Sequence, residues 1–230
     1  MTDAGDSFTS SAQSEDELEG SPILGEVLGD ALPKMEMFHV KLREEGEKRG
    51  LIGPRELPRL WERHILNSAA LAPFISELLG EARGHKLALA DVGSGAGFPG
   101  IVLASMFPDI TFTLIESMER RVEWLDEVVT ELGLMNVQIL RERAEDLPER
   151  WQFDIVTCRA VAPMTKLARW VLPLIHHGGT FVALKGRSAE AEVQKAQKEI
   201  RKAGGIRPEV IEAQVGPGLE PTHVVRLQKN

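Results

Sequence analysis

The sequence predicts a Rossmann-like α/β fold, in which helices cover both faces of a mainly parallel, seven-stranded sheet and a helical extension precedes the sheet. Three observations lead to this prediction. Apolar runs of strand length alternate with helical patterns from Lys86 onward, which is typical of parallel strands joined by crossover helices. A glycine-rich turn, 93–97, follows the first of these runs. Two runs that flank a Gly-Pro-Gly loop near the C-terminus predict an antiparallel pair at the sheet edge.

Length and composition fit one domain with a short appendage. The chain has 230 residues, of which 43% are hydrophobic, enough to fill a single core. No apolar run approaches the ~20 residues of a membrane span, so we expect no membrane partner. The N-terminus is polar and acidic, unlike a secretory signal, and the single cysteine excludes an intrachain disulfide. These features predict a cytoplasmic protein without a metal site. A monomer is the working expectation.

The charge of the chain is unevenly distributed. The net charge is −8, but residues 1–20 carry six acids and no Lys or Arg, and their Ser-rich composition predicts a disordered acidic tail. We therefore divide the chain into this tail, an N-terminal helical region packed on the core at 21–82, and a Rossmann-like core at 83–230. Two segments lean basic, at 34–63 and 185–207, and a local basic patch can guide an RNA backbone even on an acidic protein.

The elements follow from apolar spacing and from the positions of Gly and Pro. Ser21-Pro22 provides an N-cap and a first-turn proline for a first helix, and three further helices are predicted at 35–48, 56–67 and 71–79. Strands are then expected at 87–92, 111–115, 137–140, 153–158 and 180–184, and helices at 101–107, 119–132, 164–172 and 188–203. The antiparallel pair is expected at 209–214 and 223–227, and His176-His177-Gly178-Gly179 predicts an exposed loop.

The glycine-rich turn predicts a nucleotide-like cofactor. Gly93, Gly95 and Gly97 let bare backbone approach a ligand, and the helix that follows adds amide donors. Dinucleotides and S-adenosylmethionine are both bound in this way. Asp91, two residues before the first glycine, favours S-adenosylmethionine, because a carboxylate repels a diphosphate but attracts a cationic amino group and sulfonium. A packed β-α turn without a ligand is the alternative.

Other strand ends should meet the same ligand, because ligands lie beyond the carboxyl ends of parallel strands. Glu116 follows the second strand and is placed to accept hydrogen bonds from ribose hydroxyls, or else caps the next helix. The segment with Ala144 and Glu145 follows the third strand and can meet an adenine ring, or else caps a short helix. Cys158 and Arg159 end the fourth strand, where the methyl acceptor is expected.

The residues at the end of the fourth predicted strand limit which methyl-transfer reactions are possible. It lacks the Asn/Asp-Pro-Pro-aromatic motif common in exocyclic-nitrogen methylation. Cys158 is interpreted as a small buried thiol, because pyrimidine C5 methylation of RNA generally uses a second cysteine. The Arg159 guanidinium cannot act as a base at neutral pH, but it can bind a phosphate, a carboxylate or the O6/N7 edge of guanine. A salt bridge across the pocket is its structural alternative.

These motifs resemble those of the RsmG (GidB) family over roughly residues 35–230. The resemblance rests on DVGSGAGFPG, LIES, RAEDL, CRAVA, GGTFVALKG and the upstream WERHILNS. It implies an S-adenosylmethionine-dependent enzyme that methylates guanine N7 in the 530-loop region of 16S rRNA in the small ribosomal subunit. Asn67 stands where the family often has Asp. The resemblance, with the general methyltransferase pattern, implies cofactor contacts by Asp91, Gly93, Gly95, Gly97, Phe98, Glu116, Ala144, Glu145 and Arg159.

The resemblance also implies an acceptor side. Arg63, His64, Ser68 and Lys185 match family positions that border the acceptor, and we take Arg159, Lys185 and His64 as the candidate catalytic residues; a structural role is the alternative for His64. Guanine N7 already carries an in-plane lone pair, so in-line methyl transfer needs no general base, and alignment supplies the catalysis. Two other functions remain open: an NAD(P)-binding oxidoreductase, which Asp91 disfavours, and a non-catalytic module that binds cofactor or RNA.

Overall fold

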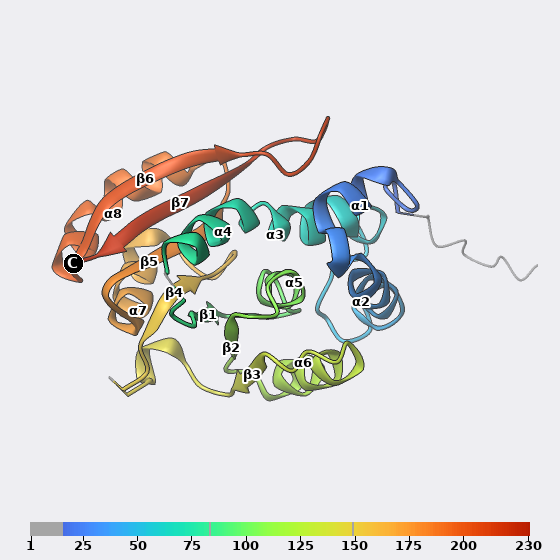
Figure 1. Cartoon of the computed structure of the whole chain (residues 1–230), viewed down its shortest axis with the longest axis horizontal. Coiled ribbons are helices and arrows are strands. Elements are labelled where there is room, and N and C mark those ends of the chain that lie inside the picture. Colours follow the sequence, from blue (N-terminus) through green and yellow to red (C-terminus); the bar gives the residue numbers. More distant parts are fainter. Residues whose placement is uncertain (1–15, 83, 149) are drawn as a thin grey trace, which may run out of the picture.

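The fold is a seven-stranded sheet with the strand order β3-β2-β1-β4-β5-β7-β6 (Figure 1). This computed structural model describes residues 16–82, 84–148 and 150–230. Strands β1 to β5 are parallel, whereas β7 pairs antiparallel with both β5 and β6, so the predicted fold class and edge hairpin are confirmed. The strands are β1 (Ala88–Val92), β2 (Thr111–Ile115), β3 (Val137–Leu140), β4 (Phe153–Thr157), β5 (Ile175–Lys185), β6 (Gly205–Ala213) and β7 (Thr222–Lys229).

Side chains of alternate strand residues pack into two hydrophobic cores, one on each face of the sheet. Leu89 of β1 belongs to the core with α5 (Gly100–Met106) and α6 (Glu119–Glu131), because side chains alternate between the faces of a strand. Its neighbour Ala90 belongs to the core with α7 (Met164–Val171) and α8 (Ala189–Lys202). The sheet is therefore covered on both faces, as the strand-helix alternation predicts.

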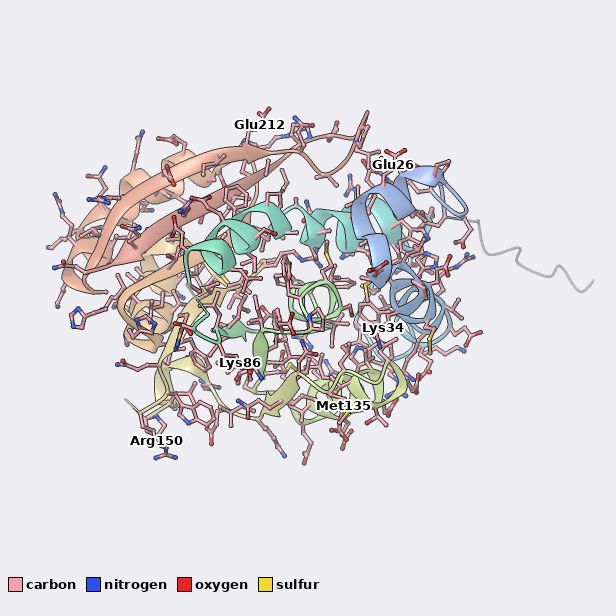
Figure 2. All side chains as sticks on the ribbon, in the orientation of Figure 1. Glu26, Lys34, Lys86, Met135, Arg150 and Glu212 are labelled. Atoms are coloured by element: carbon pink, nitrogen blue, oxygen red, sulfur yellow. The ribbon has the colours of Figure 1, made fainter. Side chains whose placement is uncertain are left out.

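The N-terminal helices share the first of these cores. They are α1 (Pro22–Leu28), α2 (Leu32–Glu45), α3 (Asn67–Ala69) and α4 (Ala72–Glu81), with a π-helical segment, η3 (Trp61–Leu66), before α3. Figure 1 shows α1 and α2 at one end of the molecule and α8 at the other, with the β6-β7 hairpin running from α8 toward α1. The side chains of Met35, Phe38 and Trp61 are buried in one cluster with those of the first core. Lys34, labelled in Figure 2, donates to the Leu132 carbonyl and ties α2 to the end of α6.

The start of the described chain is held by one buried carboxylate. The predicted disordered tail falls mostly on residues 1–15, which lie outside the described residues. Residues 17–20 form turns, and the Asp16 side chain before them is buried. Its Oδ2 accepts the Trp61 backbone N–H at 3.0 Å and lies 3.2 Å from His39 Nε2. Asp16 thus supplies a side-chain acceptor to the first turn of η3, where helical N–H groups lack intrahelical partners.

The prediction of an exposed loop at His176 and His177 is wrong. Strand β5 begins at Ile175 rather than at residue 180, so both histidines belong to the strand. The reason is a tertiary partner that the sequence pattern does not reveal: His176 Nε2 lies 2.8 Å from Oδ1 of Asp154, on the neighbouring strand β4. Asp154 also accepts the Ala88 N–H at 2.7 Å, which joins three strands at this edge.

Candidate active site

The glycine-rich loop joins β1 to α5 and comes close to the loop after β4. Gly93 has a φ of +71°, and a Cβ placed on it would lie 2.8 Å from Cγ2 of Val161. Gly97, with a φ of +112°, is similarly confined by Ile101 and Phe38. A side chain at either position is excluded both by the backbone conformation and by these neighbours. Ala160, beside Val161, also adopts a left-handed φ of +53°, so strained backbone borders the loop.

Asp91 supports this loop from below. Its side chain is fully buried, and Oδ2 accepts the Gly100 N–H at 3.0 Å at the start of α5. Within the described part of the chain, the other oxygen, Oδ1, has no hydrogen-bond partner. Burial raises the pKa of Asp91 to about 7, and the Arg159 charge opposes that rise. A cation bound above the loop would favour the ionised carboxylate.

A cavity of about 390 Å³ opens on the loop, within the ~300–1,000 Å³ common for small-molecule sites. Glu116, at the end of β2, is buried and lines this cavity. Its Oε2 accepts the Gly95 N–H at 3.0 Å, and its Oε1 accepts the Met118 N–H at 2.9 Å. The remaining lone pairs of these oxygens are acceptors for ligand hydroxyls. The wall includes the predicted residues Gly93, Gly95, Phe98, Glu116 and Arg159.

A smaller cavity of about 190 Å³ continues from the first along the strand ends. It shares Gly93 and Glu116 with the first cavity and is also lined by Ala144, Glu145 and Trp170. Ala144 and Glu145 lie in a short 3₁₀ turn, Ala144–Asp146, directly after β3. The two cavities together fit the parts of S-adenosylmethionine: they contain an acidic acceptor, Glu116, in the middle and a partly apolar recess at the β3 end, and the unpartnered Asp91 oxygen lies below the loop, outside both walls.

Arg159 separates these two cavities from a third, larger cavity. One guanidinium nitrogen donates to the Arg63 carbonyl at 3.0 Å, and the other donates to Nδ1 of His64 at 2.8 Å. The guanidinium carbon lies 4.7 Å from the centre of the Phe98 ring, a cation–π contact. Arg159 and His64 line both the first cavity and this larger one. Burial, together with the Arg159 charge, lowers the pKa of His64 to about 4, so the imidazole is neutral at neutral pH.

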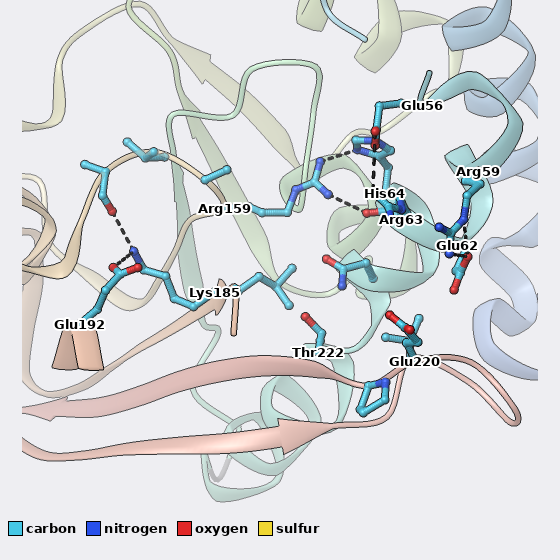
Figure 3. Close-up of a pocket in the computed structure, with 18 of the residues that line it drawn as sticks. Glu56, Arg59, Glu62, Arg63, His64, Arg159, Lys185, Glu192, Glu220 and Thr222 are labelled. Carbon is cyan, nitrogen blue, oxygen red and sulfur yellow. Dashed lines mark hydrogen bonds and ion pairs between the residues drawn. The ribbon is translucent and has the colours of Figure 1, made fainter. Parts of the chain in front are cut away.

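The larger cavity, of about 650 Å³, forms the candidate acceptor side (Figure 3). Its wall contains Arg63, Asn67 and Lys185. Lys185 is not a free cation: its Nζ donates to the Ala162 carbonyl at 2.8 Å and to Glu192 Oε2 at 2.9 Å, as Figure 3 shows. The lysine therefore ties the loop after β4 to α8, and its ammonium is largely covered.

Three predicted residues lie away from the cavity walls. Asp91 and Gly97 are buried below them, and Ser68 is fully buried, with its hydroxyl donating to the His64 carbonyl at 2.6 Å. Cys158 is also buried, and burial raises the pKa of its thiol to about 12, so the thiol stays protonated and is not a nucleophile. This agrees with its interpretation as a structural thiol.

Sequence reasoning missed two carboxylates at the acceptor side. Glu56 lies 3.1 Å from Nε2 of His64, and Glu192 holds Lys185 and the Met164 N–H. Neither residue directly follows a parallel strand, so a search of the carboxyl ends of the strands does not find them. The signal available for Glu56 was its distance of eight residues from His64 in a predicted helix. Among the described residues, no group of three or more His, Cys, Asp or Glu side chains is arranged to hold a metal ion.

The described helices include none that is both long and apolar enough to span a bilayer.

Comparison with solved structures defines the class of the fold. The chain is similar to an S-adenosylmethionine-dependent methyltransferase from Aquifex aeolicus, with a TM-score of 0.53 and 20% identity over 80% of this chain and 98% of that one. It is also similar to magnesium protoporphyrin IX methyltransferase from Synechocystis, with a TM-score of 0.54 and 12% identity over 86% and 97%. The fold is that of S-adenosylmethionine-dependent methyltransferases.

Sequence relatives identify the family within this class. Residues 31–216 match GidB, described as rRNA small subunit methyltransferase G. Curated relatives named ribosomal RNA small subunit methyltransferase G include those of Bifidobacterium adolescentis, 57% identical over 93% of this chain and 96% of that protein, and Corynebacterium glutamicum, 47% identical over 90% and 91%. This chain belongs to the rRNA small subunit methyltransferase G family.

Proposed function

We propose that this protein methylates N7 of a guanine in the 530-loop region of 16S rRNA, with S-adenosylmethionine as the methyl donor. The proposal rests on family membership and on one structural observation: Arg159 stands between two cavities and lines both of them. One cavity has the glycine loop and Glu116, and the other is lined by both arginines and glutamates. Such an arrangement lets a donor and an acceptor meet across one residue.

Each cavity has a chemical role in this proposal. Glu116 and the glycine loop would hold the ribose and the amino-acid part of the cofactor, and Ala144 and Glu145 would border its adenine. When bound, S-adenosylmethionine supplies an electrophilic methyl group on a sulfonium. Arg63, half exposed on the wall of the larger cavity, would contact an RNA phosphate, whereas Arg59 is paired with Glu62 and the four cationic side chains of this wall are matched by four carboxylates.

The residues at the boundary align rather than transfer protons. Guanine N7 needs no deprotonation, and the neutral His64 imidazole is already engaged through both nitrogens. The fixed Arg159 guanidinium can position the guanine edge or a carboxylate, and its charge is offset by Asp91 and Glu56. Alignment of this kind contributes up to about 7–11 kcal/mol to a barrier. A base in folded RNA must first be unstacked to enter, at a cost of a few kcal/mol.

The proposal also includes the partner and the setting: a monomer that acts in the cytoplasm on the small ribosomal subunit or its rRNA. Transfer of a labelled methyl group tests it, with three acceptors compared: small subunits that lack the family's modification, naked 16S rRNA, and large subunits. We expect label in the first or second acceptor and none in the third. Label in none of them, from protein that binds S-adenosylmethionine, would favour the non-catalytic binding module.

A further inference from the structure

A carboxylate, an imidazole and a guanidinium form a chain at the boundary between the two cavities (Figure 3). Arg159 donates to Nδ1 of His64 at 2.8 Å, and Nε2 of His64 lies 3.1 Å from Oε2 of Glu56. A guanidinium has no acceptor, so His64 must present a lone pair at Nδ1. The ring proton then lies on Nε2 and is donated to Glu56. The direction of both hydrogen bonds is therefore fixed by chemistry.

Glu56 is placed to hold this chain from its outer end. It precedes η3 in the sequence, and its second oxygen, Oε1, lies 3.8 Å from Arg63, whose carbonyl accepts the other Arg159 hydrogen bond. Glu56 therefore contacts both residues that accept hydrogen bonds from Arg159. Phe98 packs against both Arg159 and His64, with ring centres 5.2 Å apart for the histidine pair. The guanidinium is thus restrained on several sides.

The charges in the chain agree with this geometry. The groups that face His64 are Arg159 and Arg63, which disfavour its protonation, and Glu56, which favours it. The imidazole stays neutral at neutral pH, and its Nδ1 orients the guanidinium by accepting a hydrogen bond from it. The Glu56 and Asp91 carboxylates also favour the charged form of Arg159, which burial opposes.

We propose that Glu56 is a positioning residue for the methyl-transfer reaction: it accepts the Nε2–H of the tautomer that Arg159 requires, holds the ring orientation of His64, and so aims Arg159 at the boundary between the cavities. This inference rests on the proposed function, because the boundary is where donor and acceptor would meet. Glu56 acts through His64 and need not touch either ligand. A merely structural carboxylate that anchors the loop before η3 is the competing account.

Two variants of the full-length protein separate these accounts. Glu56→Ala removes the acceptor for Nε2–H, whereas Glu56→Gln keeps an amide oxygen that can accept the same hydrogen bond. Glu77→Ala is the matched control, because Glu77 pairs with Arg226 on another face. The ¹⁵N shifts of the His64 ring report its tautomer directly. Initial rates on small subunits give kcat and KM, and calorimetry gives the affinity for S-adenosylmethionine.

We expect Glu56→Ala to change the His64 ¹⁵N shifts and to lower kcat about tenfold or more, as misplacement of a positioning group does. Its cofactor affinity and melting temperature should stay near wild type, and Glu56→Gln should recover most of kcat. Unchanged His64 shifts in Glu56→Ala would overturn the inference, and so would equal losses of kcat and melting temperature in both variants. The ring shifts are measured without RNA, so failure of the proposed function would not be mistaken for failure of this inference.

Discussion

Replacing Asp16 with alanine tests whether the first described residues hold the segment that carries His64. The Asp16 carboxylate has no exposed surface and accepts the backbone N–H groups of Trp61 and Leu18. It also contacts His39, whose ring stacks on Trp61 with centres 4.5 Å apart. The variant leaves a buried backbone donor and a buried imidazole without their partner.

The contacts set the size of the effect. An unsatisfied buried donor costs about 1–3 kcal/mol, and a hydrogen bond to a charged group contributes about 1.5–3 kcal/mol. We expect Asp16→Ala to lower the free energy of unfolding by about 3 kcal/mol, which corresponds to roughly 6–12 °C in melting temperature for a chain of this size. Urea denaturation at pH 7 measures the free energy, and a thermal scan measures the melting temperature.

A neighbouring carboxylate provides the control. Glu17 is 66% exposed and lies 3.8 Å from Arg59, so Glu17→Ala should change stability by less than about 1 kcal/mol. The effect of Asp16 should also depend on pH. Its hydrogen bonds hold the pKa of Asp16 below 3.8, so its contribution is present at neutral pH and is lost as pH falls through the lowered folded-state pKa. An Asp16→Ala loss no larger than that of Glu17→Ala would refute this reasoning.

Three further predictions concern the site. Glu116→Ala should weaken S-adenosylmethionine binding about 10-fold or more in calorimetry, because hydrogen bonds to a charged group contribute about 1.5–3 kcal/mol; unchanged affinity would contradict its place in the cofactor cavity. Asp91→Asn should melt at or above the wild-type temperature at pH 8 but not at pH 5, since ionisation of a buried carboxyl with a pKa of about 7 destabilises the fold as pH rises. The same variant should bind S-adenosylmethionine more weakly at pH 8; equal affinity would show that the carboxylate does not attract the cofactor. Lys185→Ala should raise KM for small subunits severalfold in rate assays and change cofactor affinity by a smaller factor, because Lys185 lines the larger cavity whereas the loop that it holds borders both cavities; a larger loss of cofactor affinity than of subunit affinity would contradict its place on the acceptor side.

Most of the fold could be predicted from the sequence because each element carries a local signal. The strand at β2 and the helix at α6 have apolar spacing, and glycine or proline marks most of the turns between elements. The candidate cofactor site could be predicted equally well from the sequence, because parallel strands place their carboxyl ends along one edge of the sheet. Glu116 and Ala144 line the cavities there, as that rule predicts.

The rest depends on contacts between distant segments. Asp16 lies 45 residues from Trp61, and Glu192 lies 28 residues from Met164, so no local spacing connects them. The start of β5 was missed because His176 gains its partner from β4. Lys185 was found by resemblance, yet its ammonium faces Glu192 and a carbonyl rather than open solvent. Sequence patterns locate such a residue but do not give its partners.

The most direct test of the central claim is the position of the methyl group in the product. Small subunits that lack the modification are incubated with the protein and S-adenosylmethionine, and the extracted 16S rRNA is cleaved with borohydride and aniline, which break the chain at N7-methylguanine. We expect one new cleavage site, in the 530 loop, that is absent without protein. Methylation elsewhere in the RNA, or at an atom that does not permit this cleavage, would contradict this assignment.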